Sequence, residues 1–302
     1  MWGLAPEFGR RIIAGAFPIK PFRHRGAVPD LLSGTLGRLG SLELRLATTR
    51  KEVRKAQRLR FKVFFQEGGA IPMKGTLTRR DADKFDAFCD HLIVIDHEGK
   101  TARGKIKPTV VGAYRLLRSD VAAKKRGFYS SSEYDLAPLL ARHPEKRFLE
   151  LGRSCVLEPY RGKKTIELLW RGILAYIRAY DVDALIGCAS FEGANPLKHA
   201  VSLSFLSAHA SAAEPWTVRA RSELHIPMAM LDSSAIDPRR ALAALPPLIK
   251  GYLRVGAKFG DGAVVDRKFN TTDVFVVMPV AEMDTRYLEF FGSASPSGHR
   301  AA

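Results

Sequence analysis

Two charged residues, Glu150 and Arg153, lie three positions apart in a β-rich run of the sequence. In a regular strand, residues at this spacing point to opposite faces of the sheet. Gly152 lies between them and could form a bulge that redirects one of the two side chains. A Glu150 carboxyl buried in a sheet would have a raised pKa and could accept a proton near neutral pH. The alternative is a structural ion pair between Glu150 and Arg153.

A second group of charged residues precedes this pair in the chain. Arg60 lies one turn from Phe64 on a shared face of a predicted helix, and Arg115 lies in another β-rich run. Asp83 and Asp86 fall in an irregular stretch of mixed charge. Their carboxylates could hold an ammonium group or position one of the arginines. The alternative is that both are exposed loop charges.

Other residue types in the sequence do not form the patterns that other catalytic centres need. Cys155 has no neighbouring histidine in the sequence, and a cysteine in a strand is usually a small buried hydrophobe. Ser190 and His199 lack the G-x-S-x-G turn of a serine nucleophile. The histidines show no metal-ligand spacing, so no metal site is expected. The 3 cysteines are widely spaced and exclude both a disulfide framework and a Cys-rich zinc module.

The composition is that of an ordinary globular protein with a strong positive charge. Hydrophobic residues make up 46% of the 302 positions, and 48 Lys and Arg face 31 Asp and Glu, a net charge of +17. This surplus favours an anionic partner: nucleic acid, anionic lipid or an acidic carrier protein. Because no helix-turn-helix, zinc-finger or aromatic RNA-binding pattern is present, nucleic acid is not expected.

The sequence divides into three parts. Residues 1–40 are predicted to form a basic, mobile extension, because prolines and then glycines interrupt it. Residues 41–292 are predicted to form a single domain, and residues 293–302 a disordered tail. Residues 1–60 carry 13 basic and 4 acidic side chains. No apolar run approaches the length that spans a bilayer, so we expect a cytoplasmic protein that could rest on a membrane surface.

Hydrophobic spacing and turn residues predict helices and strands that must position the charged groups. The capping-box pattern from Thr49 to Glu52 predicts the start of a helix that ends near Phe64. Helices are also expected over 162–180, 239–255 and 284–291, with a helix or loop over 199–209 and short helices in 124–143. Strands are expected at 42–46, 91–95, 109–117, 148–157, 184–189, around 216–226 and at 273–278. This order predicts an α+β fold with a mixed sheet, and not a doubly wound dinucleotide fold.

Four motifs, taken in order, suggest a family. They are Arg60–Phe64, Asp83–Asp86, Tyr114–Leu117 and Glu150–Arg153, which resemble the Arg-x-x-x-Phe, Asp-x-x-Asp, Arg-Leu-Leu and Glu-x-x-Arg positions of acyl-homoserine-lactone synthases. Longer stretches at 149–156, 158–161, 168–173 and 187–191 look closer to bacterial ornithine N-alpha-acyltransferases. The resemblance covers residues 42–291. It implies the fold of the Gcn5-related N-acyltransferases (GNAT), with a mostly antiparallel sheet flanked by helices.

The resemblance also implies roles for individual residues. Those enzymes move an acyl chain from acyl carrier protein to an amine, and the ornithine enzymes make lyso-ornithine lipid from ornithine and 3-hydroxyacyl carrier protein. Glu150 would be the general base, with Arg153 as a second catalytic residue. Four residues would lie on the acceptor side, namely Asp83, Asp86, Arg60 and Arg115. Phe64 and Phe128 would line the acyl chain's path or belong to the core.

Two departures from the related patterns bear on the substrates. Residues 65–68 lack the Trp that usually follows the first motif of the synthases, which argues against a homoserine-lactone product. Lys164 and Ile166 stand where enzymes that use coenzyme A need small residues for their pyrophosphate turn. The phosphopantetheine arm would therefore come with acyl carrier protein, and no cofactor would be held by the chain itself. The residues expected to contact the acidic carrier are Arg161, Lys163, Lys164 and Arg171.

The combined expectation is an N-acyltransferase that moves a 3-hydroxyacyl chain from acyl carrier protein to the α-amine of L-ornithine. One alternative is an acyltransferase for another amino acid or for a homoserine-lactone-type acceptor. A non-enzymatic alternative is a basic protein that binds membrane surfaces. The shape of the acceptor pocket, which no motif specifies, decides between the amino acids.

Overall fold

The described residues form a sheet of ten strands in the order β1-β2-β3-β4-β6-β7-β10-β9-β8-β5. The structure is a computed structural model, and it describes residues 29–71, 78–100, 104–284 and 286. The strands are β1 Thr35–Leu39, β2 Leu42–Leu46, β3 Asp90–Asp96, β4 Thr109–Arg118, β5 Tyr134–Asp135, β6 Phe148–Val156, β7 Ala184–Glu192, β8 Arg219–Ala220, β9 Lys258–Asp266 and β10 Thr271–Pro279. Neighbours run antiparallel except β6 with β7 and β8 with β9. The predicted mixed, largely antiparallel sheet is confirmed.

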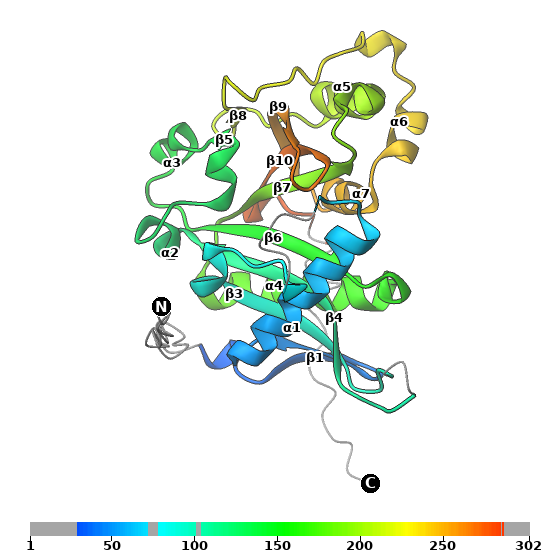
Figure 1. Ribbon diagram of the computed structural model, residues 1–302. Helices are drawn as coiled ribbons and strands as arrows, with labels where there is room; N and C mark the ends of the chain where they lie inside the picture. Colours follow the sequence, from blue (N-terminus) through cyan, green and yellow to red (C-terminus); the bar gives the residue numbers. More distant parts are fainter. Residues whose placement is uncertain (1–28, 72–77, 101–103, 285, 287–302) are drawn as a thin grey trace, which may run out of the picture.

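Seven α-helices connect and cover the strands in the described part of the chain (Figure 1). They are α1 Arg50–Phe61, α2 Ser119–Ala123, α3 Ala137–Arg142, α4 Lys163–Tyr180, α5 Ala200–His209, α6 Pro238–Ala244 and α7 Pro247–Arg254. A π-helical segment, Lys62–Glu67, continues α1. Short 3-10 turns occur at Asp30–Leu32, Lys84–Ala87, Tyr129–Ser132, Glu158–Tyr160, Pro196–His199, Ser233–Ala235 and Val280–Glu282.

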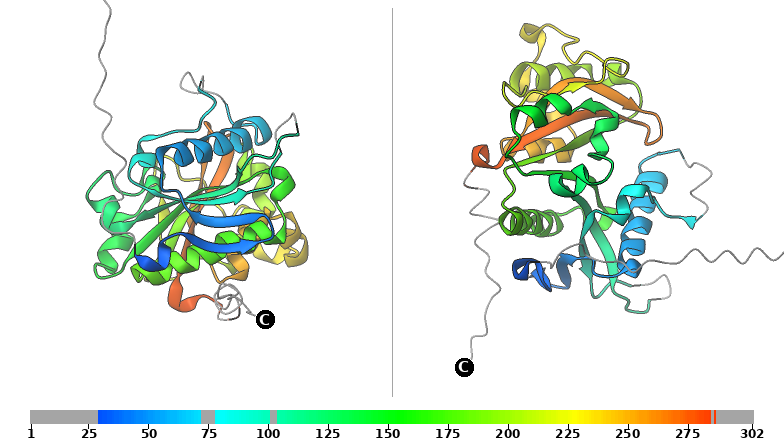
Figure 2. Two further views of the ribbon diagram at one scale, coloured as in Figure 1. Left: turned by 90° about the horizontal axis from the view of Figure 1, so that it is seen from below. Right: turned by 90° about the vertical axis from the view of Figure 1, so that its left-hand side faces the viewer.

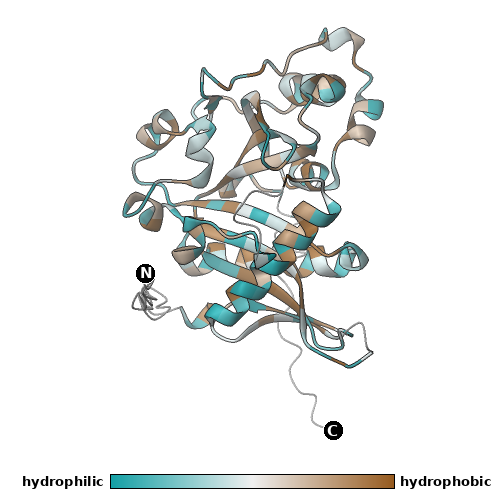
Figure 3. Ribbon diagram, in the orientation of Figure 1, coloured by the Kyte–Doolittle hydropathy of each residue, from teal (hydrophilic) through white to brown (hydrophobic). Residues whose placement is uncertain are grey.

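The two longest helices pack on opposite faces of the sheet (Figure 2). Helix α1 begins with the predicted capping box: the Thr49 hydroxyl accepts from the Glu52 amide at 3.3 Å, and the Glu52 carboxylate accepts from the Thr49 amide. Helix α4 buries an apolar face that includes Leu169 and Ile173 against the sheet. In Figure 3, residues coloured as hydrophobic recur along the central strands that these helices cover. The helix over 162–180 predicted from the sequence is therefore confirmed.

The sheet opens between the parallel strands β6 and β7. Their pairing runs only from Phe148 opposite Ala184 to Glu150 opposite Ile186, although β6 continues to Val156 and β7 to Glu192. Gly187 stands where the strands part, and a Cβ there would lie 2.4 Å from the Leu151 carbonyl oxygen. Beyond this point the two strands separate. The space between them is part of a cavity, and residues of both strands line it.

Several predicted elements differ from the structure. The strand expected around 216–226 is confirmed only in part, as the two residues Arg219–Ala220 and an isolated bridge from Ile226 to Ala263. Strand β9 was not predicted. The helix expected over 239–255 is two helices, because Pro246 and Pro247 interrupt the backbone hydrogen bonding. The predicted helix over 284–291 lies almost wholly outside the described residues.

The predicted boundary of the extension at residue 40 is also wrong. Thr35–Leu39 form strand β1, which pairs with β2, and Leu32 is buried in the core. A short hydrophobic strand that pairs with its neighbour can be ordered despite the glycines around it. The rest of the predicted extension, residues 1–28, and the predicted tail at 293–302 lie outside the described residues.

Candidate active site

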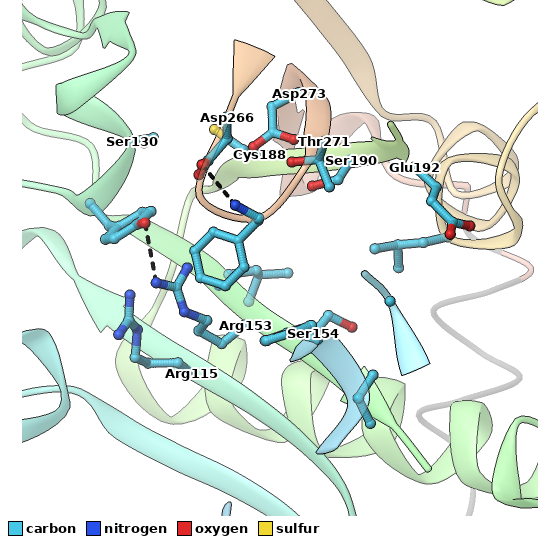
Figure 4. Close-up of a pocket in the computed structure, with 18 of the residues that line it drawn as sticks. Arg115, Ser130, Arg153, Ser154, Cys188, Ser190, Glu192, Asp266, Thr271 and Asp273 are labelled. Carbon is cyan, nitrogen blue, oxygen red and sulfur yellow. Dashed lines mark hydrogen bonds between the residues drawn. The ribbon is translucent and has the colours of Figure 1, made fainter. Parts of the chain in front are cut away.

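A cavity of about 390 Å³ occupies the opening between β6 and β7 (Figure 4). Strand β6, the π-helical segment, the Tyr129–Ser130 turn, β7 and the β9–β10 hairpin all contribute to its wall. The polar and charged residues in the wall are Glu67, Arg115, Tyr129, Ser130, Glu150, Arg153, Ser154, Arg161, Cys188, Ser190, Glu192, Asp266, Thr271 and Asp273.

A bulge in β6 brings Glu150 and Arg153 to the same cavity. On β4, Ala113 and Arg115 are two positions apart, and they pair with Cys155 and Gly152 of β6, which are three apart. The extra residue makes the bulge that the sequence predicted at this place. The left-handed backbone belongs to Arg153 itself, with φ of 53°, and not to Gly152. Both charged side chains therefore line the cavity instead of facing opposite sides of the sheet.

Three arginines and three aspartates form a buried ion-pair network beside the cavity. Arg60, only 1% exposed, donates from Nη1 and Nη2 to the two carboxylate oxygens of Asp86 at 2.7 and 2.8 Å. Its Nε donates to Asp81 Oδ2 at 2.9 Å. Burial raises the pKa of the Asp86 carboxyl, but the hydrogen bonds and charge of Arg60 outweigh it and hold that pKa well below its usual range.

The other two arginines of the network extend it to the cavity wall. Arg115 Nη1 donates to both carboxylate oxygens of Asp83 at 2.7 Å. Arg153 donates from Nε to Asp81 Oδ2 at 3.1 Å and from Nη2 to the Tyr129 hydroxyl at 3.1 Å. The three positive charges face three carboxylates, so the network is neutral in sum and rigid.

The predicted acceptor-side residues therefore fall into two groups. Arg115 lines the cavity. Arg60, Asp83 and Asp86 do not line it, because their charged atoms are paired inside the network. For Asp83 and Asp86 the geometry supports the second role that the sequence suggested, positioning of Arg115 and Arg60. Contact of Arg60, Asp83 or Asp86 with substrate stays a prediction.

Glu150 is buried, and hydrogen bonds from one turn engage both of its carboxylate oxygens. Oε2 accepts from the Tyr129 amide at 2.7 Å, and Oε1 accepts from the Ser130 amide and hydroxyl at 2.8 and 2.6 Å. Burial raises the pKa of Glu150 above its ordinary value even though these three donors oppose it. The carboxylate anchors the Tyr129–Ser130 turn to the cavity wall, and a role as general base remains a prediction.

The remaining predicted residues are separated by the fold. Phe64 lines the cavity and meets the Phe269 ring edge-on at 5.7 Å, whereas Phe128 is buried in the core. Among the predicted carrier-binding residues, Arg161, Lys163 and Lys164 are exposed together where α4 begins. Arg171 does not belong with them, since it is partly buried and pairs with Glu167 at 2.6 Å.

Two carboxylates that sequence reasoning did not single out, Asp266 and Asp273, line another part of the cavity, and the Glu133 carboxylate lies beside them without lining it. Oxygen atoms of Glu133, Asp266 and Asp273 all lie within 4.8 Å of one another, a spacing that could also suit a metal ion. The Cys188 thiol donates to Glu133 at 3.4 Å. A signal was present at Asp273, because an acidic residue lies in the otherwise apolar strand β10. The other two could not be associated with it from the sequence.

The buried thiols give no sign of a covalent route. Cys155 is buried, and burial raises the pKa of its thiol to about 12. Burial likewise raises the pKa of the Cys188 thiol, and the charge on Glu133 adds to the effect. A thiol with a raised pKa carries little thiolate at neutral pH, so neither is an activated nucleophile.

Comparison with known proteins places the chain in a class and then in a family. A family model described as "Acetyltransferase (GNAT) domain" matches residues 59–171, from α1 into α4. The match and the mixed sheet define a GNAT-fold acyltransferase. The chain is 49% identical over 270 residues to the L-ornithine N(alpha)-acyltransferase of Rhizobium meliloti (strain 1021), covering 89% of this chain and 90% of that protein. It is 50% identical over 260 residues to the enzyme of the same name from Agrobacterium fabrum (strain C58), covering 86% and 88%.

The chain therefore belongs to the L-ornithine N(alpha)-acyltransferase family. The resemblance drawn from the sequence motifs and the predicted GNAT fold are both confirmed, and the non-enzymatic alternative is set aside.

More distant likenesses exist among solved structures. The N-acyl amino acid synthase FeeM is 12% identical with a TM-score of 0.43, covering 80% of this chain and 92% of that one. The AHL synthase LasI is 11% identical with a TM-score of 0.42, covering 86% and 98%. The assignment does not depend on them. In the part of the chain that the structure describes, no helix is both long and apolar enough to cross a bilayer.

Proposed function

We propose that this protein transfers a 3-hydroxyacyl chain from acyl carrier protein to the α-amine of L-ornithine. Ornithine is assigned as the acceptor because the chain is related to L-ornithine N(alpha)-acyltransferases over about nine-tenths of both chains. The cavity supports it, because guanidinium groups and carboxylates stand in different parts of one wall, as an amino acid with two amines requires. The alternatives with another amino acid or a homoserine-lactone-type acceptor have no such support.

The proposed reaction needs few groups. The α-amine nitrogen attacks the thioester carbonyl, the C–N bond forms, the C–S bond breaks, and the amine's proton passes to a base while the thiolate leaves with the carrier. Glu150 is the proposed base, since its raised pKa and its place in the cavity wall suit proton transfer near neutral pH. Arg115 and Arg153, held by aspartates, provide positive charge for the acceptor's carboxylate.

The opening between β6 and β7 supports a carrier-bound donor. A phosphopantetheine arm is an extended chain with amide groups, and the facing edges of the two strands beyond Glu150 and Ile186 are not paired with each other. Arg161, Lys163 and Lys164 are exposed near this opening, where an acidic carrier could dock. The phosphopantetheine would arrive with the carrier and leave with it.

The test uses purified protein, 3-hydroxyacyl carrier protein and ornithine. We expect release of the carrier thiol that depends on ornithine, together with N-acylornithine detected by mass spectrometry. Acylation of another amino acid at a higher kcat/KM than ornithine would overturn the acceptor assignment. Faster transfer from the matching acyl-coenzyme A would overturn the donor assignment.

Contact with a membrane surface is the second part of the proposal. The product would be a single-chain lipid that must enter a bilayer, and residues 1–60 carry 13 basic against 4 acidic side chains. We expect binding to anionic vesicles that is lost at high salt and weakened when residues 1–28 are deleted, a truncation that keeps β1. Co-sedimentation of both proteins at two salt concentrations tests it; equal binding by both would show that residues 1–28 have no membrane role.

A further inference from the structure

The carboxylate cluster of Glu133, Asp266 and Asp273 contains one buried oxygen atom, Asp273 Oδ1, that lacks a well-placed hydrogen-bond donor in the part of the chain that the structure describes. Asp273 is 7% exposed, and its Oδ1 accepts no hydrogen bond of good geometry among the described residues, although the hydroxyl groups of Ser190 and Thr271 lie close enough to lower its pKa. Asp266 Oδ1 accepts from the amides of Lys268 and Phe269 at 2.8 and 3.0 Å, which fixes its direction. A buried acceptor without a hydrogen-bond donor raises the free energy of the folded protein. A ligand that supplies N–H donors would therefore be stabilised at this position.

The cluster is also without a direct ion-pair partner among the described residues. None of its three carboxylates forms an ion pair in the described part of the chain, in contrast to Asp81, which pairs with Arg60 and Arg153. Burial raises the pKa of both Glu133 and Asp273, and the charge on Asp266 adds to the effect in each, while the positive charge of Arg153 offsets it only in part. Carboxylates in this state would be stabilised by a cation that enters the cavity.

The two ends of the cavity wall differ in charge. Figure 4 shows Asp266, Thr271 and Asp273 together on one side, and Arg115 and Arg153 on another. Phe269 links them: its ring lies 4.6 Å from the Arg153 guanidinium, and its amide binds Asp266. A molecule with a carboxylate at one end, an ammonium at the other and a short methylene chain between them fits this arrangement.

We propose that Glu133, Asp266 and Asp273 bind the side-chain ammonium of a diamino-acid acceptor, and that they thereby direct acylation to the α-amine. The inference rests on the proposed function, in which the acceptor is ornithine. Carboxylates around an ammonium favour its charged form, and a protonated nitrogen has no lone pair to attack a thioester. The cluster therefore keeps the side-chain amine unreactive while the α-amine is placed at the thioester carbonyl.

The decisive comparison is between ornithine and norvaline, which has the same carbon chain without the side-chain ammonium. For the wild-type enzyme we expect a much higher kcat/KM with ornithine. Asp273→Asn should lower kcat/KM for ornithine on the order of 10–10²-fold, as for a lost hydrogen bond between charged groups, and change the norvaline value by less than about threefold. Glu133→Gln should act in the same direction. Asp261→Asn, which removes an exposed carboxylate from the same strand as Asp266, is the matched control and should change neither value.

The position of the acyl group gives a second readout. Tandem mass spectrometry should find only the α-acyl product with the wild-type enzyme and a measurable side-chain acyl product with Asp273→Asn. An equal loss for both acceptors with unchanged regiochemistry would overturn the inference, because it is the result expected of a general base or of a structural role. Activity that a chelator abolishes and Mg²⁺ or Ca²⁺ restores would also overturn it, since the cluster would then hold a metal. If the wild-type enzyme does not acylate ornithine at all, the proposed function itself fails, a distinct result.

Discussion

At the scale of single residues, a buried carboxylate on β6 has one observed structural function and one proposed catalytic function, and experiments can separate them. Glu150 anchors the Tyr129–Ser130 turn and is the proposed base. Glu150→Gln should therefore reduce kcat on the order of 10²–10⁴-fold, the usual contribution of a general base. Circular dichroism must show that the variant is folded, because the new amide group would face backbone N–H donors.

Ser130→Ala distinguishes the two functions of Glu150. The Ser130 hydroxyl lowers the pKa of Glu150 by hydrogen bonding to its charged form, so its removal should raise that pKa. If Glu150 is the base, the acidic limb of the profile of kcat/KM against pH should move to higher pH. A lower melting temperature with an unmoved limb would mean that Glu150 only anchors the turn.

The raised pKa of Glu133 predicts how the free energy of unfolding depends on pH. Burial, with the charge on Asp273, raises the pKa of Glu133 to about 8, above its value in an unfolded chain. The folded state therefore favours the protonated form of Glu133. The stability that this form contributes is fully present below the unfolded pKa and is lost as pH rises through 8, because the buried carboxyl must then ionise. The free energy of unfolding should fall by roughly 1 kcal/mol per pH unit between pH 7 and 8. Urea titrations should show a flatter profile for Glu133→Gln; a fall as steep as in the wild-type protein would contradict the assignment.

At the scale of elements, the site depends on two strands that begin as a parallel pair and then separate. The bulge at Arg153 turns β6, and Gly187 allows the backbones to come close at the point where β7 departs. Helix α1 and its π-helical continuation place Arg60 inside the ion-pair network and Phe64 on the cavity wall. These irregular segments, and not the regular parts of the sheet, create the cavity.

Gly187→Ala tests this account of the opening. A Cβ at this position would lie 2.4 Å from the Leu151 carbonyl oxygen, so the strands must shift. We expect a loss of about 1–3 kcal/mol in the free energy of unfolding, measured with urea, together with reduced activity. The control is Gly251→Ala in α7, where a Cβ meets no atom within 4 Å; it should leave stability unchanged or raise it by up to about 1 kcal/mol. Equal effects at both positions would show that the close approach at Gly187 does not matter.

At the scale of the whole molecule, the positive charge is proposed to serve an acidic carrier near the cavity. Charge reversal by Lys163→Glu and Lys164→Glu should raise KM for acyl carrier protein several-fold with little change in kcat, and the effect should shrink at high salt. Arg178→Glu, an exposed change on the same helix at its far end, is the control. If all three variants raise KM equally, the effect is one of net charge and the start of α4 has no special role.

Local patterns in the sequence were sufficient for much of the fold and for the family. The capping box at Thr49 and the spacing of apolar residues in α4 predicted helices that the structure contains, because both signals act between residues a few positions apart. The motif around Glu150 also predicted the bulge that places Arg153. The break at Pro247 could have been predicted from the proline alone.

Tertiary structure decided which charged side chains form ion pairs and which do not. From their spacing in the sequence, Asp83 and Asp86 could equally have been a pair of carboxylates that binds an ammonium group. In the structure, Arg115 and Arg60 reach them from other segments and form ion pairs with them. Glu133 and Asp273 are 140 positions apart, and only the packing of the β9–β10 hairpin against the turn before β5 brings them together. Spacing along a chain specifies neighbours within one helix or strand. The partners of a buried charge depend on contacts between distant segments, which form only when the whole sheet is assembled.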